Sequence, residues 1–227
     1  LEKKPVIPDS VTADLPTVAV RMPSHPVFHD LAKLCPFPLA APSANPFGYL
    51  SPTRVDHVQS QMGHVLEWIL DGGICKRGIE STILSLVDPA NPAVLRYGVI
   101  SADELSTFLG QEVVQKNTSD EGDSTGLISA GLMKRHYSPK TKVQLFEGSP
   151  PESDKHVAIV FLGKPATEAS NQFSLSAEGN LEEVAQNLYA TLQQLDKQGY
   201  DIIHLEQPES LGTGVAIRDR MRRAAAE

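Results

Sequence analysis

Short apolar runs separated by proline and glycine occupy most of the first hundred residues. Four of these runs have the length and composition of β-strands: TVAVRM at 17–22, PLAAP at 38–42, ESTILSLV at 80–87 and AVLRYG at 93–98. Between them, apolar side chains recur at helical spacing after Ser24 and again, at Val65, Trp68 and Ile69, after Ser51-Pro52, which should start the second helix. Ser101 and Glu104 form a capping-box pattern before another short helix. The pattern predicts a mixed α/β unit.

A polar stretch without apolar periodicity, residues 115–130, follows this unit. Its composition is typical of a surface linker, and we expect a domain boundary here. Beyond it the order β, β, α, β, α is predicted by VQLFEG, VAIVFLG, an amphipathic stripe from Leu181 to Leu195, DIIHLE and TGVAIRDRMRRAAAE. We therefore predict an α/β protein, with a twisted mixed sheet and helices in residues 1–114, a linker at 115–141 and a small Rossmann-like unit at 142–227.

Composition and charge exclude several classes of protein. The 227 residues are 41% hydrophobic and 21% charged, and no run approaches the roughly 18 apolar residues of a membrane helix. The first residues lack the apolar core of a secretory signal, so a cytosolic location is expected. Cys35 and Cys75 form no CxxC pair, which disfavours a disulfide framework and a cysteine zinc site. The net charge of -8 disfavours a broad nucleic-acid footprint but permits a local basic cleft.

Several common motifs are missing from the sequence. It contains no GxxxxGK[ST] phosphate loop, no HExxH and no GxSxG. The glycine pair at Gly212 and Gly214 is better interpreted as a turn that opens the last helix than as a dinucleotide site. His25 and His29 have the spacing of metal ligands on a helix, but Pro26 lies between them and no third ligand is evident, which disfavours a metal site.

The first informative segment is APSANPFGYLSPTRVDHV, residues 41–58. Small polar residues follow a predicted strand, Gly48 permits close approach, and a helix N-terminus comes next, which together favour an anion such as phosphate. The alternative is that Ser51 is only an N-cap and Ser43 only a turn former.

Two further segments carry cations beside glycines or aromatic residues. In DGGICKRGIESTILSLVDPANPAVLRYG, residues 71–98, Arg96 stands two residues before Gly98 and fits either a phosphate or carboxylate fork or a surface ion pair. In GLMKRHYSPKT, residues 131–141, Tyr137 either covers a bound base or serves as an interdomain latch. The same basic and aromatic segment also contains Lys134, Arg135, His136 and Lys140.

Taken together, these strings resemble the L-threonylcarbamoyladenylate synthase family in the long form with a C-terminal accessory domain. TVAVRMPSHP, PLAAPSAN, the SPT that follows, LDGG, GIESTI and LRYG stand in that family's order and approximate spacing, with LRYG in place of LRPG. RHYSP resembles its interdomain linker and GTGVAIRDRMRRAA its C-terminal end. On this resemblance, residues 1–114 are the C-terminal portion of the catalytic domain and 142–227 the accessory domain.

The resemblance implies an enzyme that makes threonylcarbamoyl-AMP and pyrophosphate from L-threonine, bicarbonate and ATP with Mg²⁺. This is the first step towards N6-threonylcarbamoyladenosine in tRNA, and a downstream threonylcarbamoyl transferase is the implied partner. Motif matching assigns Thr17, Ser43, Ser51, Arg96 and Tyr137 to ATP, Arg21, Ala41 and Ser81 to threonine, and Asn45 to the shape of the loop. No residue is assigned as a catalytic acid or base, because Glu80 at a strand end is expected to be a structural acceptor.

One departure from the family pattern changes the expected activity. The family's catalytic domain begins with a segment that contains a Lys-x-Arg motif, and nothing before TVAVR supplies it. The chain is therefore expected to start inside the catalytic domain, to leave an exposed sheet edge and an incomplete ATP site, and to turn over poorly. Two alternative functions remain: an RNA-binding module of the same fold, opposed by the negative charge and the few aromatic residues, and an inactive fragment.

Overall fold

The computed structural model describes residues 1–116, 136–152, 154–167 and 169–226. We call residues 1–116 the N-terminal part and residues 142–226 the C-terminal part. The N-terminal part contains the helices α1 (Asp9–Thr12), α2 (Pro26–Leu34), α3 (Val55–Met62) and α4 (Ala102–Leu109) and a small sheet. The predicted linker residues 117–135, including Lys134 and Arg135, lie outside the described residues.

The small sheet has the strand order β1-β2-β3. Its strands are β1 (Ile83–Ser85), β2 (Ala93–Arg96) and β3 (Val114–Gln115), with β1 antiparallel and β3 parallel to β2. Helix α4 makes the crossover between the parallel strands. It begins with the predicted capping box, in which Ser101 Oγ accepts from the backbone N–H of Glu104 at 3.2 Å and the Glu104 carboxylate accepts from the N–H of Ser101 at 2.8 Å.

Several predicted elements of the N-terminal part are wrong or shorter. Residues 17–22 and 38–42 form no strand in the structure. Of the predicted strand at 80–87, only Ile83–Ser85 pairs with another strand. A strand needs a neighbouring strand along its length. Among the described residues, the first segment has only an isolated bridge from Thr17 to Glu2, and the second pairs with no strand. Apolar composition alone therefore overestimated the sheet.

The second predicted helix is also displaced from the position that its sequence pattern indicated. Helix α3 begins at Val55 rather than after Ser51, because the Ser51 hydroxyl donates to a distant carboxylate instead of capping the helix. It ends at Met62, before Val65 and Trp68 of the predicted apolar stripe. Trp68 is 88% exposed, so no packing among the described residues favours a longer helix.

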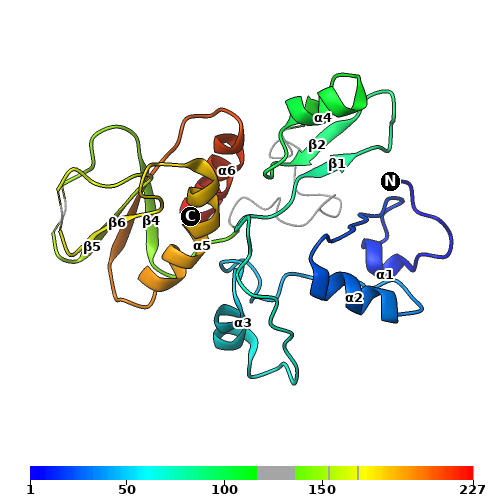
Figure 1. The fold of residues 1–227 in the computed structure, drawn as a ribbon, viewed down its shortest axis with the longest axis horizontal. Coiled ribbons are helices and arrows are strands. Elements are labelled where there is room, and N and C mark those ends of the chain that lie inside the picture. Colours follow the sequence, from blue (N-terminus) through cyan, green and yellow to red (C-terminus); the bar gives the residue numbers. More distant parts are fainter. Residues whose placement is uncertain (117–135, 153, 168, 227) are drawn as a thin grey trace.

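The C-terminal part is a parallel sheet with two helices beside it. Its strands, β4 (Lys142–Phe146), β5 (Val157–Phe161), β6 (Gln172–Ser174) and β7 (Ile202–Glu206), lie in the order β4-β7-β5-β6. Helices α5 (Leu181–Leu195) and α6 (Thr213–Ala225) stand between this sheet and the N-terminal part (Figure 1). The predicted β, β, α, β, α order is confirmed, and so is the turn at Gly212 before α6. Only β6 was missed, since three residues are too short to show alternation.

Most of the buried apolar residues belong to the C-terminal part, yet the core crosses between the parts. Leu50 is fully buried and Ile79 is 7% exposed, and both lie in one cluster with Leu188 and Leu192 of α5. Burying a leucine or isoleucine side chain contributes about 1.5–3 kcal/mol. The two parts are therefore held together by shared apolar burial as well as by polar contacts.

Gly78 marks a close backbone approach between the two parts. It has φ +70, and an added Cβ would lie 2.2 Å from the carbonyl oxygen of Ala185 in α5. Gly73 has a similar φ of +81 but nothing within 4 Å of the corresponding position. A comparison of substitutions at Gly78 and Gly73 therefore separates two costs. One is the cost of the left-handed backbone conformation, and the other is the cost of placing a side chain against α5.

Replacing Gly78 with alanine is expected to destabilise the protein more than replacing Gly73. The backbone cost is about 1–2 kcal/mol for each variant, and Gly78→Ala should lose about 1–3 kcal/mol more because α5 must move away. Urea unfolding of the two variants beside the unchanged protein measures the difference. Equal losses would show that the close approach at Gly78 does not matter.

Candidate functional site

Glu80 is the centre of a polar cluster between the two parts. One of its carboxylate oxygens accepts from the Ser51 hydroxyl at 2.6 Å, and the other accepts from Nε of Arg220 at 2.7 Å and from the Tyr189 hydroxyl at 3.1 Å. Burial raises the pKa of Glu80, but attraction to Arg220 and the hydrogen bonds outweigh it, so the pKa is lowered overall. The carboxylate is thus held in its charged form with both oxygens occupied.

Arg220 of α6 brings the positive charge into this cluster. Its side chain is fully buried, and besides Glu80 it donates from Nη2 to the carbonyl oxygen of Tyr97 at 2.6 Å and from Nη1 to Asp219. Its guanidinium carbon lies 5.2 Å from the centre of the Tyr137 ring, in the range of a cation–π contact. Burial alone would lower the pKa of Arg220, but its anionic and phenolic neighbours raise the pKa by a larger amount. The pKa is therefore raised overall, and the guanidinium stays charged.

Arg96 ends β2 beside the cluster, and its side chain reaches Ser81 in the segment just before β1. Its Nε and Nη2 donate to the carbonyl oxygen of Ser81 at 3.1 and 3.0 Å, and Nη2 lies 3.4 Å from the Ser81 hydroxyl. The residue is 9% exposed, which rules out the interpretation of Arg96 as a surface ion-pair partner. Burial is the main cause that lowers the pKa of Arg96, and the positive charges of Arg220 and Arg21 act in the same direction.

Tyr137 anchors the described end of the linker between the two parts. It is 2% exposed, and its ring stacks on Tyr189 with 5.7 Å between the ring centres. The next residue, Ser138, donates its backbone N–H to the carbonyl oxygen of Gly48 at 3.0 Å and its hydroxyl to that of Ala224 at 3.0 Å. In this structure Tyr137 therefore has the geometry of an interdomain latch.

The remaining predicted site residues form no hydrogen bond with Glu80 among the described residues. Asn45 donates to the carbonyl oxygens of Pro46 at 2.9 Å and Tyr49 at 3.1 Å, so it fixes the turn that leads to Ser51. Arg21 is exposed, although its charge acts on Arg96. Thr17 forms a backbone bridge to Glu2. Among the described residues, no hydrogen bond ties the side chains of Thr17 or Ser43, or the backbone of Ala41, to the cluster.

Both parts of the chain match known protein families. Residues 1–98 match the Sua5/YciO/YrdC family, described as "Telomere recombination", and residues 100–226 match the family described as "Threonylcarbamoyl-AMP synthase, C-terminal domain". The Threonylcarbamoyl-AMP synthase of Pyrococcus abyssi is 34% identical over 240 residues, which is 99% of this chain and 68% of that protein. The chain belongs to the threonylcarbamoyl-AMP synthase family. This confirms the resemblance of its motifs.

Further comparisons agree with this family assignment and show how much of a family member's length the chain covers. The Bacillus subtilis Threonylcarbamoyl-AMP synthase is 35% identical over 95% of this chain and 65% of its own length. A crystal structure of P. abyssi Sua5 complexed with L-threonine superposes with a TM-score of 0.84 and 32% identity, over 99% of this chain and 68% of that one. The α/β fold is thus confirmed, and the chain spans about two thirds of the length of these family members.

Sequence analysis missed the two C-terminal residues that complete the cluster in this family member. Arg220 and Tyr189 lie in helices that the sequence predicted, but neither was expected near the site. A signal was present in α6, because Arg220 falls on the same helix face as Ile217 and Ala224, which are buried. An arginine within an apolar stripe indicates a buried anionic or carbonyl partner.

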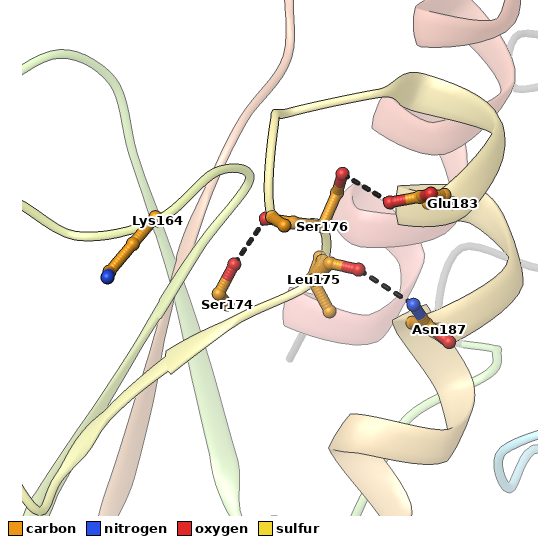
Figure 2. A pocket seen from close by; sticks show the side chains of 7 residues that line it. Lys164, Ser174, Leu175, Ser176, Glu183 and Asn187 are labelled. Atoms are coloured by element: carbon orange, nitrogen blue, oxygen red, sulfur yellow. Dashed lines mark hydrogen bonds between the residues drawn. The ribbon is translucent and has the colours of Figure 1, made fainter.

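A cavity of about 410 Å³ lies elsewhere in the C-terminal part, at the carboxyl ends of β5 and β6 (Figure 2). Its polar side chains are engaged with one another: the Ser176 hydroxyl donates to Glu183 at 2.6 Å and Asn187 donates to the carbonyl oxygen of Leu175 at 2.8 Å. These bonds tie the loop after β6 to the first turns of α5. None of the site residues predicted from the sequence lines this cavity.

His25 stands at the N-cap of α2, and His29 lies within this helix. His25 Nε2 lies 3.0 Å from the carbonyl oxygen of Gly72, so this ring joins two segments of the N-terminal part. In the described residues no three His, Cys, Asp or Glu side chains converge. The described helices are all too short or too polar to cross a lipid bilayer.

Acid is expected to weaken the fold, first through its histidines. Burial is the main cause that lowers the pKa of His57, His136 and His204 from 6.5, so on acidification the unfolded chain takes up protons before the folded one. The histidine contribution is complete above about pH 6.5 and declines below it. The lowered pKa of Glu80 adds a second loss that begins below its ordinary value of 4.5.

Urea unfolding at pH about 7.5, 6.5 and 5.5 measures the first of these losses. The midpoint should fall with pH, and it should fall less in a His57→Gln, His136→Gln variant, which lacks two of the titrating rings. A midpoint that rises on acidification would contradict this assignment.

Proposed function

We propose that the chain acts as a threonylcarbamoyl-AMP synthase, forming threonylcarbamoyl-AMP and pyrophosphate from L-threonine, bicarbonate and ATP. The main supporting observation is that Ser51, Ser81, Arg96 and Tyr137, assigned to substrates by their motifs, meet around Glu80 from segments far apart in the sequence. Its relatives carry the same activity in their names. We assign the catalytic portion to residues 1–114, the linker to 115–141 and the accessory portion to 142–227.

The reaction needs positioning and charge neutralisation more than a strong base. The amine of threonine adds to carbon dioxide derived from bicarbonate and loses a proton, which gives a carbamate anion. A carbamate oxygen then attacks the α-phosphorus of ATP, and the bond to the β-phosphate oxygen breaks to release pyrophosphate. Glu80 is not proposed as a base, because each of its oxygens already accepts a hydrogen bond.

The proposed substrate contacts follow the motif assignments. The two arginines among them differ in burial and in proposed role. Thr17, Ser43, Ser51, Arg96 and Tyr137 are assigned to ATP, Arg21, Ala41 and Ser81 to threonine, and Asn45 to the loop. Arg96 is buried and charged, so it is suited to neutralise phosphate. Arg21 is exposed and suited to clamp the threonine carboxylate.

The assignment of Ser51 to ATP has a structural condition. Its hydroxyl hydrogen is donated to Glu80 at 2.6 Å, and a hydroxyl has only one hydrogen to give. Ionised phosphate oxygens only accept hydrogen bonds, so Ser51 in this orientation serves ATP as an acceptor, for a donor such as a ribose hydroxyl. Glu80 thereby fixes the direction in which the Ser51 oxygen accepts.

Magnesium is proposed as part of the ATP substrate. Because Mg²⁺ bound with nucleotides is held largely by phosphate oxygens and water, this role does not require a set of protein ligands.

A downstream transferase that acts on tRNA is the proposed recipient of the product, in the cytosol. The net charge of -8 opposes the RNA-binding alternative.

Replacement of Arg96 by alanine is expected to weaken ATP binding about ten- to a hundredfold. The loss corresponds to one charge-assisted contact of about 1.5–3 kcal/mol. Arg54→Ala is the matched control, since Arg54 is an exposed arginine of the same part that pairs with Asp56 at 2.9 Å. Calorimetric titration with ATP and Mg²⁺ measures both variants, and an unchanged affinity in Arg96→Ala would refute the assignment.

Equilibrium binding tests the proposed function directly. Calorimetry of the whole chain with L-threonine, with Mg-ATP and with both should show that each ligand strengthens the binding of the other, and D-threonine should not replace the L isomer. Binding of single-stranded RNA without any response to L-threonine or ATP would favour the RNA-binding alternative. Absence of all binding would favour an inactive fragment.

A further inference from the structure

The buried pair of Arg220 and Glu80 joins the two parts of the chain. Arg220 is 0% exposed and Glu80 is 16% exposed at the side chain. Arg220 comes from α6, close to the end of the chain, whereas Glu80 comes from the segment just before β1. A buried charged pair stabilises the contact only where its hydrogen bonds are well made, and here Ser51, Tyr189 and Arg220 all lie within hydrogen-bond distance of Glu80.

Each residue of the pair also contacts a residue assigned to ATP. Glu80 accepts the hydroxyl hydrogen of Ser51, which fixes the rotamer of that side chain. Arg220 lies beneath the Tyr137 ring at 5.2 Å and holds the carbonyl oxygen of Tyr97, the residue after Arg96. The pair therefore contacts two of the assigned residues, Ser51 and Tyr137, and the backbone of the residue that follows a third.

Helix α5 supports the same segment from the other side. Gln193 donates to the carbonyl oxygen of Ser51 at 3.0 Å and accepts from Gln61 at 3.1 Å. Tyr189 contacts both Glu80, through its hydroxyl, and Tyr137, through its ring. The backbone and the side chain of Ser51 are thus both fixed by groups that depend on the C-terminal part.

We propose that Arg220 and Glu80 are positioning residues through which the C-terminal part sets the geometry of Ser51 and Tyr137 for nucleotide binding. This inference rests on the proposed function for its ligand. The guanidinium orients the carboxylate, the carboxylate orients the serine hydroxyl, and the same guanidinium also contacts the tyrosine ring. Neither residue needs to touch the substrate.

The experiment compares Arg220→Lys with Arg218→Lys in the whole chain. Lysine keeps the charge but loses the fork that spans Glu80 and Tyr97. Arg218 lies in the same helix and bonds Glu147 and the carbonyl oxygen of Pro208, both within the C-terminal part, so it is a matched control. Backbone hydrogen exchange at residues 48–53 and 136–138 should become at least tenfold faster in Arg220→Lys and stay within twofold in Arg218→Lys.

Binding of Mg-ATP to the same variants tests the consequence for the site. Arg220→Lys should bind about tenfold or more weakly and Arg218→Lys within twofold. Ser51→Ala, Glu80→Gln and their double variant should lose similar amounts, since Glu80 acts through Ser51. Independent losses that multiply in the double variant would overturn the positioning role.

Failure of the inference and failure of the proposed function give different results. If the unchanged protein binds ATP and the two lysine variants behave alike, the positioning role is wrong and the function stands. If the unchanged protein binds no ATP, the function fails. Hydrogen exchange then decides whether Arg220 holds the two segments, and equal exchange in both variants rejects the inference.

Discussion

Replacement of Arg220 by alanine should lower the free energy of unfolding by about 3–5 kcal/mol. The change removes the guanidinium from a fully buried position and leaves the Glu80 carboxylate without its cation. The carbonyl oxygen of Tyr97 loses a donor at the same time, and the Tyr137 ring loses its cation–π contact. Urea unfolding at pH about 7.5 measures the loss.

A control from the same helix separates this effect from the general cost of losing an arginine. Arg218→Ala breaks an ion pair whose partner, Glu147, is 63% exposed, and such a pair contributes about 0–1 kcal/mol. The Arg220 variant should therefore unfold at a clearly lower urea concentration than the Arg218 variant. Similar midpoints would show that the interdomain pair adds little to stability.

Replacement of Tyr137 by alanine is expected to cost about 3–5 kcal/mol, the range for large aromatic side chains removed from a core. The ring is 2% exposed and packs on Tyr189 with 5.7 Å between the ring centres. Its removal opens a cavity at the contact between the two parts. Thermal unfolding measures the loss as a lower midpoint temperature.

Tyr137→Phe is the matched control for this prediction. It keeps the ring, its stacking and its contact with Arg220, and removes only the hydroxyl, so the loss should stay below about 1.5 kcal/mol. If phenylalanine destabilised the protein as much as alanine, the hydroxyl rather than the ring would be the anchoring group. The latch described above would then need another explanation.

Local sequence signals predicted the C-terminal part well. Helix α5 shows a clean apolar stripe, and β4, β5 and β7 are short apolar runs bounded by polar residues, so their type follows from residues close in sequence. The capping box at Ser101 is equally local. Such elements need little knowledge of their partners.

The N-terminal part was predicted less well because its elements depend on distant partners. The runs at 17–22 and 38–42 are apolar enough for strands, yet pairing decides whether a strand forms, and no run of residues encodes its own neighbour. Ser51 was expected at a helix N-terminus, but the Glu80 carboxylate, distant in sequence, takes its hydroxyl hydrogen.

The candidate site shows the same limit at the level of single residues. Motif order indicated Ser81 and Arg96, which the structure joins directly. It did not indicate Arg220, since a helix of arginines and alanines near the end of the chain carries no nucleotide motif. Only the fold brings this side chain to Glu80, so a residue that acts through another is the hardest kind to find from sequence.

Incubation of the whole chain with L-threonine, Mg-ATP and ¹³C-bicarbonate, followed by mass spectrometry of the nucleotides, is the most direct test of the account. We expect a threonylcarbamoyl-AMP product that carries the label from bicarbonate and disappears when L-threonine is omitted. The method also detects the slow turnover predicted from the sequence. Absence of any labelled adduct after prolonged incubation, or an adduct that forms without label, would contradict the proposed reaction.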